Sequence, residues 1–128
     1  MTTILCVDDE PGNRALLARL LTRSGYRVIQ AAHVRGAIDS IHREPALALI
    51  LLDLNLPEVD GFDALRMIKA DPRTREIPVV VVSSTAKASA EEEVQQLGAN
   101  EFVGNPVTDD RILGAVRRAI GPQSAPAT

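Results

Sequence analysis

The stretch LALILLD, residues 47–53, consists of six apolar residues followed by one acid. An apolar run without polar alternation is typical of a strand that is buried on both faces, as in a parallel sheet between two helix layers. Residues 77–82 form a second run of this kind. These two runs predict the centre of a parallel sheet.

Shorter apolar segments alternate with helical periodicities on either side of these runs. We expect strands at Thr3–Val7, Tyr26–Ala31, Leu47–Leu52, Ile77–Val82 and Glu101–Gly104. Five helices are expected where apolar residues recur at three- and four-residue steps. These residues are Leu16, Leu17, Leu20 and Leu21, then Val34, Ala37, Ile38 and Ile41, then Phe62, Leu65 and Ile68, then Ala90, Val94 and Leu97, and finally Ile112, Leu113, Val116 and Ile120.

Three glycines, Gly25, Gly98 and Gly121, follow the first, fourth and fifth of these helices, where a helix often ends on a residue with positive φ. Five βα units predict a doubly wound, flavodoxin-like α/β fold with strand order 2-1-3-4-5 and five helices. This order places the first and third strands side by side, and a ligand site is expected at their carboxyl ends.

The length of 128 residues fits one domain, which we expect over residues 1–120. Residues 121–128, which include two prolines and two alanines, have the composition of a flexible tail or of a truncated linker. The net charge of −3 and the lack of a basic run argue against direct binding to nucleic acid or to an anionic membrane, so we expect a protein partner. A single cysteine and short apolar stretches indicate a cytoplasmic protein without a membrane span.

Acidic residues follow two of the predicted strands. Asp8 and Asp9 close the first strand and Asp53 closes the third, so all three carboxylates should converge at the sheet edge. Carboxylates held this close stay ionised together only with a cation, and oxygen ligands favour Mg²⁺ or Mn²⁺. Alternatively, Asp9 caps the helix that begins near Pro11, and Asp53 makes a turn. Helix capping explains Asp9 but not Asp53, so we favour a metal site.

A carboxylate beside a metal ion can also attack phosphorus and form an aspartyl phosphate. Asp53 is the candidate nucleophile. The fourth strand is followed by Ser83-Ser84-Thr85, which would place hydroxyl donors beside the same cleft, although such runs also occur as turns or helix caps.

Together these residues resemble the receiver domain of bacterial two-component response regulators, and closely its single-domain, chemotaxis-type members, from residue 3 to about 120. Asp8 and Asp9 match the family's acidic pair, Asp53 its phosphoacceptor, Ser83 its hydroxyl residue and Phe102 its aromatic residue. The spacing between these residues is also that of typical members.

The resemblance implies a magnesium site in which Asp9 and Asp53 ligate by side chain, Asn55 ligates by its backbone carbonyl and Asp8 acts through water. Ser83 would bond a phosphoryl oxygen. Asn55 and Thr85 would occupy the variable positions that influence how quickly the phosphoryl group is hydrolysed.

The resemblance also implies a switch that includes Ser83 and Phe102, and a cis peptide bond before Pro106. The phosphodonor would be a histidine kinase or a histidine phosphotransfer protein. A downstream protein target would bind the face made by the fourth helix, the fifth strand and the fifth helix. Such a receiver is a signalling switch and not an enzyme that turns over a free substrate.

Asn105 departs from the family pattern, because it stands where the family has a lysine before the proline. A neutral amide would replace a charged donor, and charge-assisted hydrogen bonds are roughly twice as strong as neutral ones. The alternative function is therefore a degenerate receiver that binds its partner without phosphorylation. An aspartate-nucleophile phosphatase is disfavoured, because its active loop would need an acid at the position of Asn55. A nucleotide-binding or flavin-binding protein is disfavoured as well, because Asp8-Asp9-Glu10 would repel the phosphate of the ligand. We favour the phosphoacceptor.

Overall fold

The computed structural model describes residues 2–43, 46–54, 61–72, 74–83, 89–104 and 106–121. Strands and helices alternate along these residues in the predicted order. The elements are β1 (Thr3–Val7), α1 (Pro11–Arg23), β2 (Arg27–Ala31), α2 (Val34–Arg43), β3 (Leu47–Asp53), α3 (Gly61–Ala70), β4 (Val79–Val82), α4 (Ser89–Gln96), β5 (Glu101–Val103) and α5 (Asp109–Ile120).

The strands form one five-stranded parallel sheet in the order β2-β1-β3-β4-β5. This confirms the predicted doubly wound topology. β1 lies between β2 and β3, and its residue Val7 is paired with Ala31 on one side and with Leu52 on the other. The first and third strands therefore end next to each other, as expected from the order.

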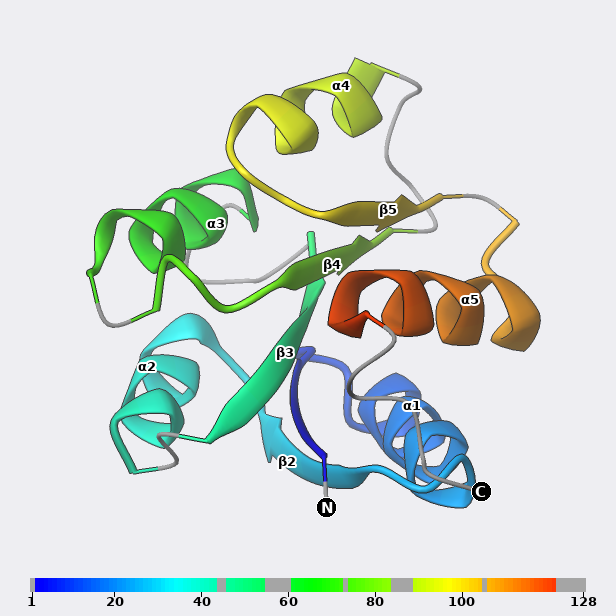
Figure 1. The fold of residues 1–128 in the computed structure, drawn as a ribbon. Helices are drawn as coiled ribbons and strands as arrows, with labels where there is room; N and C mark the ends of the chain where they lie inside the picture. Colours follow the sequence, from blue (N-terminus) through cyan, green and yellow to red (C-terminus); the bar gives the residue numbers. More distant parts are fainter. Residues whose placement is uncertain are drawn as a thin grey trace.

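Helices cover both faces of the sheet (Figure 1). α1 and α5 pack on one face, and α2, α3 and α4 pack on the other. Successive residues of β3 face opposite layers, since Leu51 belongs to the α1–α5 core and Leu52 to the α2–α3–α4 core. Burial on both faces is the physical reason for the unbroken apolar run in β3.

Two predicted strand starts are too early. β4 begins at Val79 and not at Ile77, because Pro78 has no N–H for the ladder and the Ile77 N–H donates to the Thr74 carbonyl at 2.9 Å. β2 begins at Arg27, because the Tyr26 N–H still bonds the Leu21 carbonyl of α1 at 3.1 Å.

Two predicted strand ends also differ by one residue. β3 continues through Asp53, which is paired with Val82 of β4, and β5 ends at Val103, before Gly104. Gly25, Gly98 and Gly121 all have positive φ, at 97°, 106° and 87°, which confirms the predicted helix ends.

The predicted apolar face of α1 is wrong at one position. Leu17 and Leu21 are buried as expected, but Leu16 is 65% exposed. Leu16 instead lines a cavity at the carboxyl edge of the sheet. Among the residues that the structure describes, every helix is too short or too polar to cross a lipid bilayer.

Candidate functional site

The site lies at the carboxyl edge of the sheet, where three neighbouring strands end. Val7 of β1 is paired with Leu52 of β3, so Asp8 follows β1 at the level of Asp53. Asp53 is in turn paired with Val82 of β4, so Ser83 follows at the same edge. The register of the sheet therefore brings residues from β1, β3 and β4 to one place.

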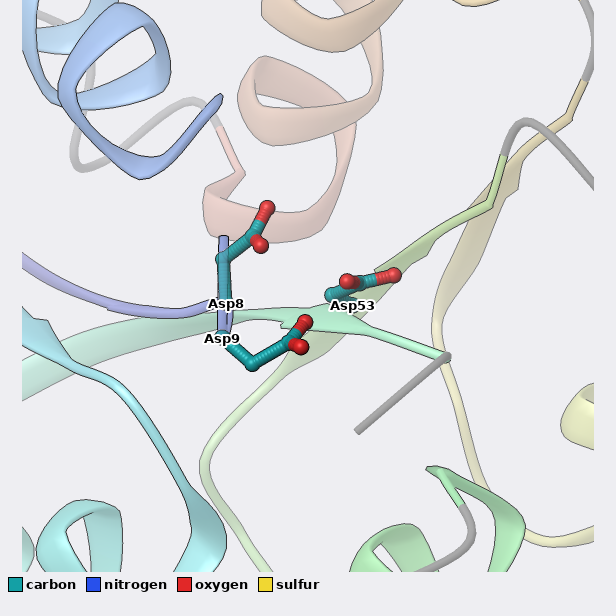
Figure 2. A group of neighbouring side chains, drawn as sticks. All are labelled: Asp8, Asp9 and Asp53. Carbon is teal, nitrogen blue, oxygen red and sulfur yellow. The ribbon is translucent and has the colours of Figure 1, made fainter. Parts of the chain in front are cut away.

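The carboxylates of Asp8, Asp9 and Asp53 form an acidic cluster. One oxygen from each of the three residues lies within 4.8 Å of the others. Figure 2 shows the Asp9 side chain pointing toward Asp53, while the Asp8 side chain turns toward the helical layer above. Asp8 is buried, and Asp9 and Asp53 are partly exposed. The predicted convergence of the three acids is confirmed.

Hydrogen bonds hold Asp8 in place. Its Oδ1 accepts a hydrogen bond from the backbone N–H of Glu10 at 2.9 Å, and its Oδ2 accepts one from the side-chain amide of Asn13. The Arg14 guanidinium donates from Nη1 to the Asp8 backbone carbonyl at 2.7 Å. Asp8 is only 1% exposed, and these donors lower the free-energy cost of burying its charge.

The N-cap of α1 is Glu10 and not Asp9. The Glu10 carboxylate accepts hydrogen bonds from the Gly12 and Asn13 N–H groups at 3.1 and 2.7 Å, and Pro11 occupies the first helical position. The alternative in which Asp9 is a helix cap is therefore wrong. Because Glu10 performs the capping, the Asp9 side chain can belong to the acidic cluster.

A cavity of about 570 Å³ opens beside the acidic cluster and is lined by residues of α1, of the start of α5 and of the strand ends. Its lining combines polar and acidic side chains with aliphatic side chains from the strands, from the two helices and from the segment before α5. The polar lining comprises Asp8, Glu10, Asn13, Asp53, Ser83 and Asp109, and the apolar lining includes Leu16, Leu20, Val107 and Ile112. Ser83 is predicted as a hydroxyl donor, and it lines the same cavity as Asp53.

The chemistry of the acidic cluster fits a hard divalent cation. Its donors are carboxylate oxygens, which Mg²⁺ and Mn²⁺ prefer, and three carboxylates within 4.8 Å repel one another strongly without a cation. The residues present therefore fit the ion expected from the sequence.

Several predicted site residues lie outside the part of the chain that the structure describes. These are Asn55, Thr85 and Asn105, and with Asn105 the peptide bond to Pro106. Phe102 is described: it is partly buried and packs against the α2–α3–α4 core. The residues that flank position 105 are also described, and Arg111 of α5 donates from Nη1 to the carbonyls of Gly104 at 2.7 Å and Pro106 at 2.5 Å.

Asn13 and Arg111 were not predicted as site residues. The cap at Glu10 could have been recognised, because a proline at the first helical position places the cap one residue before it. No sequence signal of this kind indicates the hydrogen bond from Asn13 to Asp8, which depends on how α1 packs against β1.

Comparisons with known proteins match this arrangement. The family model of the response regulator receiver domain matches residues 4–117. The polar-differentiation response regulator DivK of Brucella anthropi is 31% identical over 119 residues, which are 93% of this chain and 96% of that protein.

Solved structures agree with the sequence relatives. A sensor protein from a Polaromonas species is 30% identical, with a TM-score of 0.85 and coverage of 93% of this chain and 95% of that one. The receiver domain of a sensor histidine kinase from Pseudomonas aeruginosa is also 30% identical, with a TM-score of 0.82 and coverage of 94% of this chain and 98% of that one. That structure is described with a magnesium ion coordinated in the active-site cleft.

Proposed function

The chain belongs to the response regulator receiver family, and we propose that it accepts a phosphoryl group on Asp53 from a phosphohistidine of a partner protein. Receiver domains are generally signalling modules of two-component systems that bind histidine kinases or phosphotransfer proteins and downstream targets. The observation that carries the proposal is the acidic cluster: Asp8, Asp9 and Asp53 converge at the carboxyl edge of the sheet, as a phosphorylation site of this family requires.

A divalent cation completes the proposed site. Asp9 and Asp53 would hold Mg²⁺ by their side chains, Asn55 would hold it by its backbone carbonyl, and Asp8 would act through a water molecule. The ion would offset the negative charge of the cluster and of the incoming phosphoryl group.

In the transfer, a carboxylate oxygen of Asp53 attacks phosphorus and forms the new O–P bond. The N–P bond of the phosphohistidine breaks, and its electron pair stays on the imidazole nitrogen. Ser83, next to the register partner of Asp53, would donate a hydrogen bond from its hydroxyl to a phosphoryl oxygen. Asn105 would offer an amide donor in place of the family's lysine.

Phosphorylation would alter the face made by α4, β5 and α5, where a downstream protein would bind. Phe102 of β5 would take part in this change together with Ser83, and the peptide bond before Pro106 would be cis. The proposed domain spans residues 1–120, followed by a tail or linker at 121–128, and the proposed location is the cytoplasm.

The alternative of a degenerate, phosphorylation-independent binding module depends on Asn105, which lies outside the described residues. The convergence of all three carboxylates favours the phosphoacceptor, because a module that needs no phosphorylation has no use for a buried Asp8 beside two further acids.

The proposal is tested by incubating the protein with acetyl phosphate, a small phosphodonor, and measuring its intact mass. We expect a gain of one phosphoryl group in the presence of Mg²⁺ and none when EDTA removes the ion. An unchanged mass with Mg²⁺ over several hours would contradict phosphoacceptor function.

A further inference from the structure

The hydrogen bonds of Asp8 come from two different kinds of donor. Oδ1 accepts from the main-chain N–H of Glu10, which any non-proline residue at position 10 would supply. Oδ2 accepts from the side chain of Asn13, which only a polar residue at position 13 can supply. The orientation of Oδ2 therefore depends on the identity of one side chain of α1, that of Asn13.

The position of Asn13 is itself fixed by the start of the helix. The Glu10 carboxylate accepts from the Asn13 N–H at 2.7 Å, so the cap that begins α1 also holds the backbone of Asn13. Arg14, the next residue, holds the Asp8 carbonyl at 2.7 Å. The first turn of α1 therefore fixes both the main chain and the side chain of Asp8.

The chemical nature of Asn13 suits a cation site. An amide donor can orient a carboxylate without neutralising it, whereas a lysine or arginine at the same place would compete with a metal ion for the negative charge. Asn13 also lines the same cavity as Asp53 and Ser83, so it lies beside the proposed reaction site. Partners that orient ligands in this way commonly tune metal affinity.

We propose that Asn13 is a positioning residue that orients the Asp8 carboxylate for divalent-cation binding by the acidic cluster. This inference rests on the proposed function, because it assumes that the cluster binds Mg²⁺. Asn13 itself does not ligate the ion; it acts through Asp8.

The test compares Asn13→Ala with Asn100→Ala. Asn100 is a matched control, since its side chain also makes one described hydrogen bond, from the Val79 N–H to its Oδ1 at 3.0 Å, but at the opposite edge of the sheet. For each protein, Mg²⁺ affinity is measured by amide chemical shifts, and the free energy of unfolding is measured by urea titration in EDTA. The EDTA measurement reports whether each variant is folded without the ion.

We expect Asn13→Ala to weaken Mg²⁺ binding about tenfold, at the lower end of the losses seen when a partner that orients a metal ligand is removed. Asn100→Ala should bind Mg²⁺ as the wild type does, whatever it loses in stability. A purely structural role would lower the stability of Asn13→Ala in EDTA without changing its Mg²⁺ affinity, and this result would overturn the inference. Equal losses of affinity in both variants would overturn it as well.

Failure of the proposed function gives a different result. If the wild type itself neither shifts with millimolar-scale Mg²⁺ nor gains mass with acetyl phosphate, the phosphoacceptor proposal is wrong. If the wild type does both and Asn13→Ala matches it, only the role of Asn13 is wrong.

Discussion

Asp53 of β3 and Val82 of β4 are paired in register on adjacent parallel strands, so Asp53 and Ser83 lie at the same edge of the sheet. The ladder continues one step beyond this pair, where the Leu54 N–H donates to the Val82 carbonyl at 3.2 Å. The backbone around the proposed phosphoacceptor is therefore fixed by the sheet, and this rigidity favours a preorganised site.

Asp8 and Asp9 should differ in their contribution to Mg²⁺ binding. Asp9→Ala is expected to raise the Mg²⁺ dissociation constant more than Asp8→Ala, because Asp9 would bind the ion directly and Asp8 through water. Amide shifts during a Mg²⁺ titration measure both constants. A larger loss in Asp8→Ala would reverse these assigned roles.

Replacing Asn105 with lysine should accelerate phosphorylation. A lysine at this position would offer the phosphoryl oxygens a charged donor, and a charged hydrogen bond exceeds a neutral one by about 1 kcal/mol. This difference corresponds to roughly fivefold in rate if it is expressed in the transition state. The labelling rate with acetyl phosphate is measured for the wild type and Asn105→Lys.

Asn105→Gln is the control for side-chain length, because it lengthens the side chain but keeps it neutral. It should label at about the wild-type rate. If the labelling rate of Asn105→Gln rises as much as that of Asn105→Lys, the length of the side chain and not its charge limits the labelling rate of the wild type.

Gly104 should be required for the position of the Phe102 ring. A Cβ on residue 104 would lie 2.8 Å from the Phe102 Cε1, so Gly104→Ala must displace the ring. We expect altered Phe102 ring shifts in NMR spectra and a loss of about 1–3 kcal/mol in the free energy of unfolding, as for other overpacked sites.

Gly114→Ala is the matched control, because its added Cβ would meet only the flexible end of Arg118 at 3.3 Å. Gly114 lies within α5, where alanine favours the helix by roughly 0.5–1 kcal/mol. Unchanged Phe102 ring shifts in Gly104→Ala would contradict the prediction, because they would show that a Cβ at position 104 does not displace the ring.

Cys6 should make the stability of the protein depend on alkaline pH. Burial, with a further contribution from the charge of Asp8, raises the pKa of its thiol from 9.0 to about 12. Above pH 9 the unfolded chain releases a proton that the folded chain keeps, so rising pH favours unfolding. The free energy of unfolding should therefore fall between pH 9 and pH 12, by at most about 1.4 kcal/mol per pH unit from this group.

Cys6→Ala lacks this titration and should lose stability with pH less steeply, although the smaller side chain lowers its stability at every pH. Urea unfolding at several pH values between about 8 and 10 compares the two slopes. Equal slopes would mean that the buried thiol does not contribute to the pH dependence.

Much of the fold follows from the apolar runs, because a strand buried on both faces leaves a clear pattern. Residues 47–52 predict β3 and its place in the centre of the sheet, and the alternation of strands and helices predicts the order. The predicted starts of β2 and β4 are less accurate, because single backbone groups decide them: the Tyr26 N–H bonds the Leu21 carbonyl of α1, and Pro78 has no N–H for the ladder. The pattern of apolar residues carries little information about such individual backbone hydrogen bonds.

The acidic cluster was predictable for the same reason. Asp8 and Asp9 follow β1 and Asp53 ends β3, and the strand order makes these two strands neighbours, so the convergence of the three acids follows from the strand order. The contact between Asn13 and Asp8 was not predictable, because it requires the packing of α1 on the sheet and a particular side-chain conformation. Asn105 is distinguished in the sequence only by its departure from the family pattern.

The position of the phosphoryl group tests the role of Asp53 most directly. After labelling with acetyl phosphate and Mg²⁺, borohydride reduces an aspartyl phosphate to homoserine, and peptide mass spectrometry then identifies the modified position. We expect homoserine at position 53 of the wild type and no modified acid in Asp53→Ala. Homoserine at Asp8 or Asp9 of the wild type, or undiminished labelling of Asp53→Ala, would contradict the assignment of Asp53 as the phosphoacceptor.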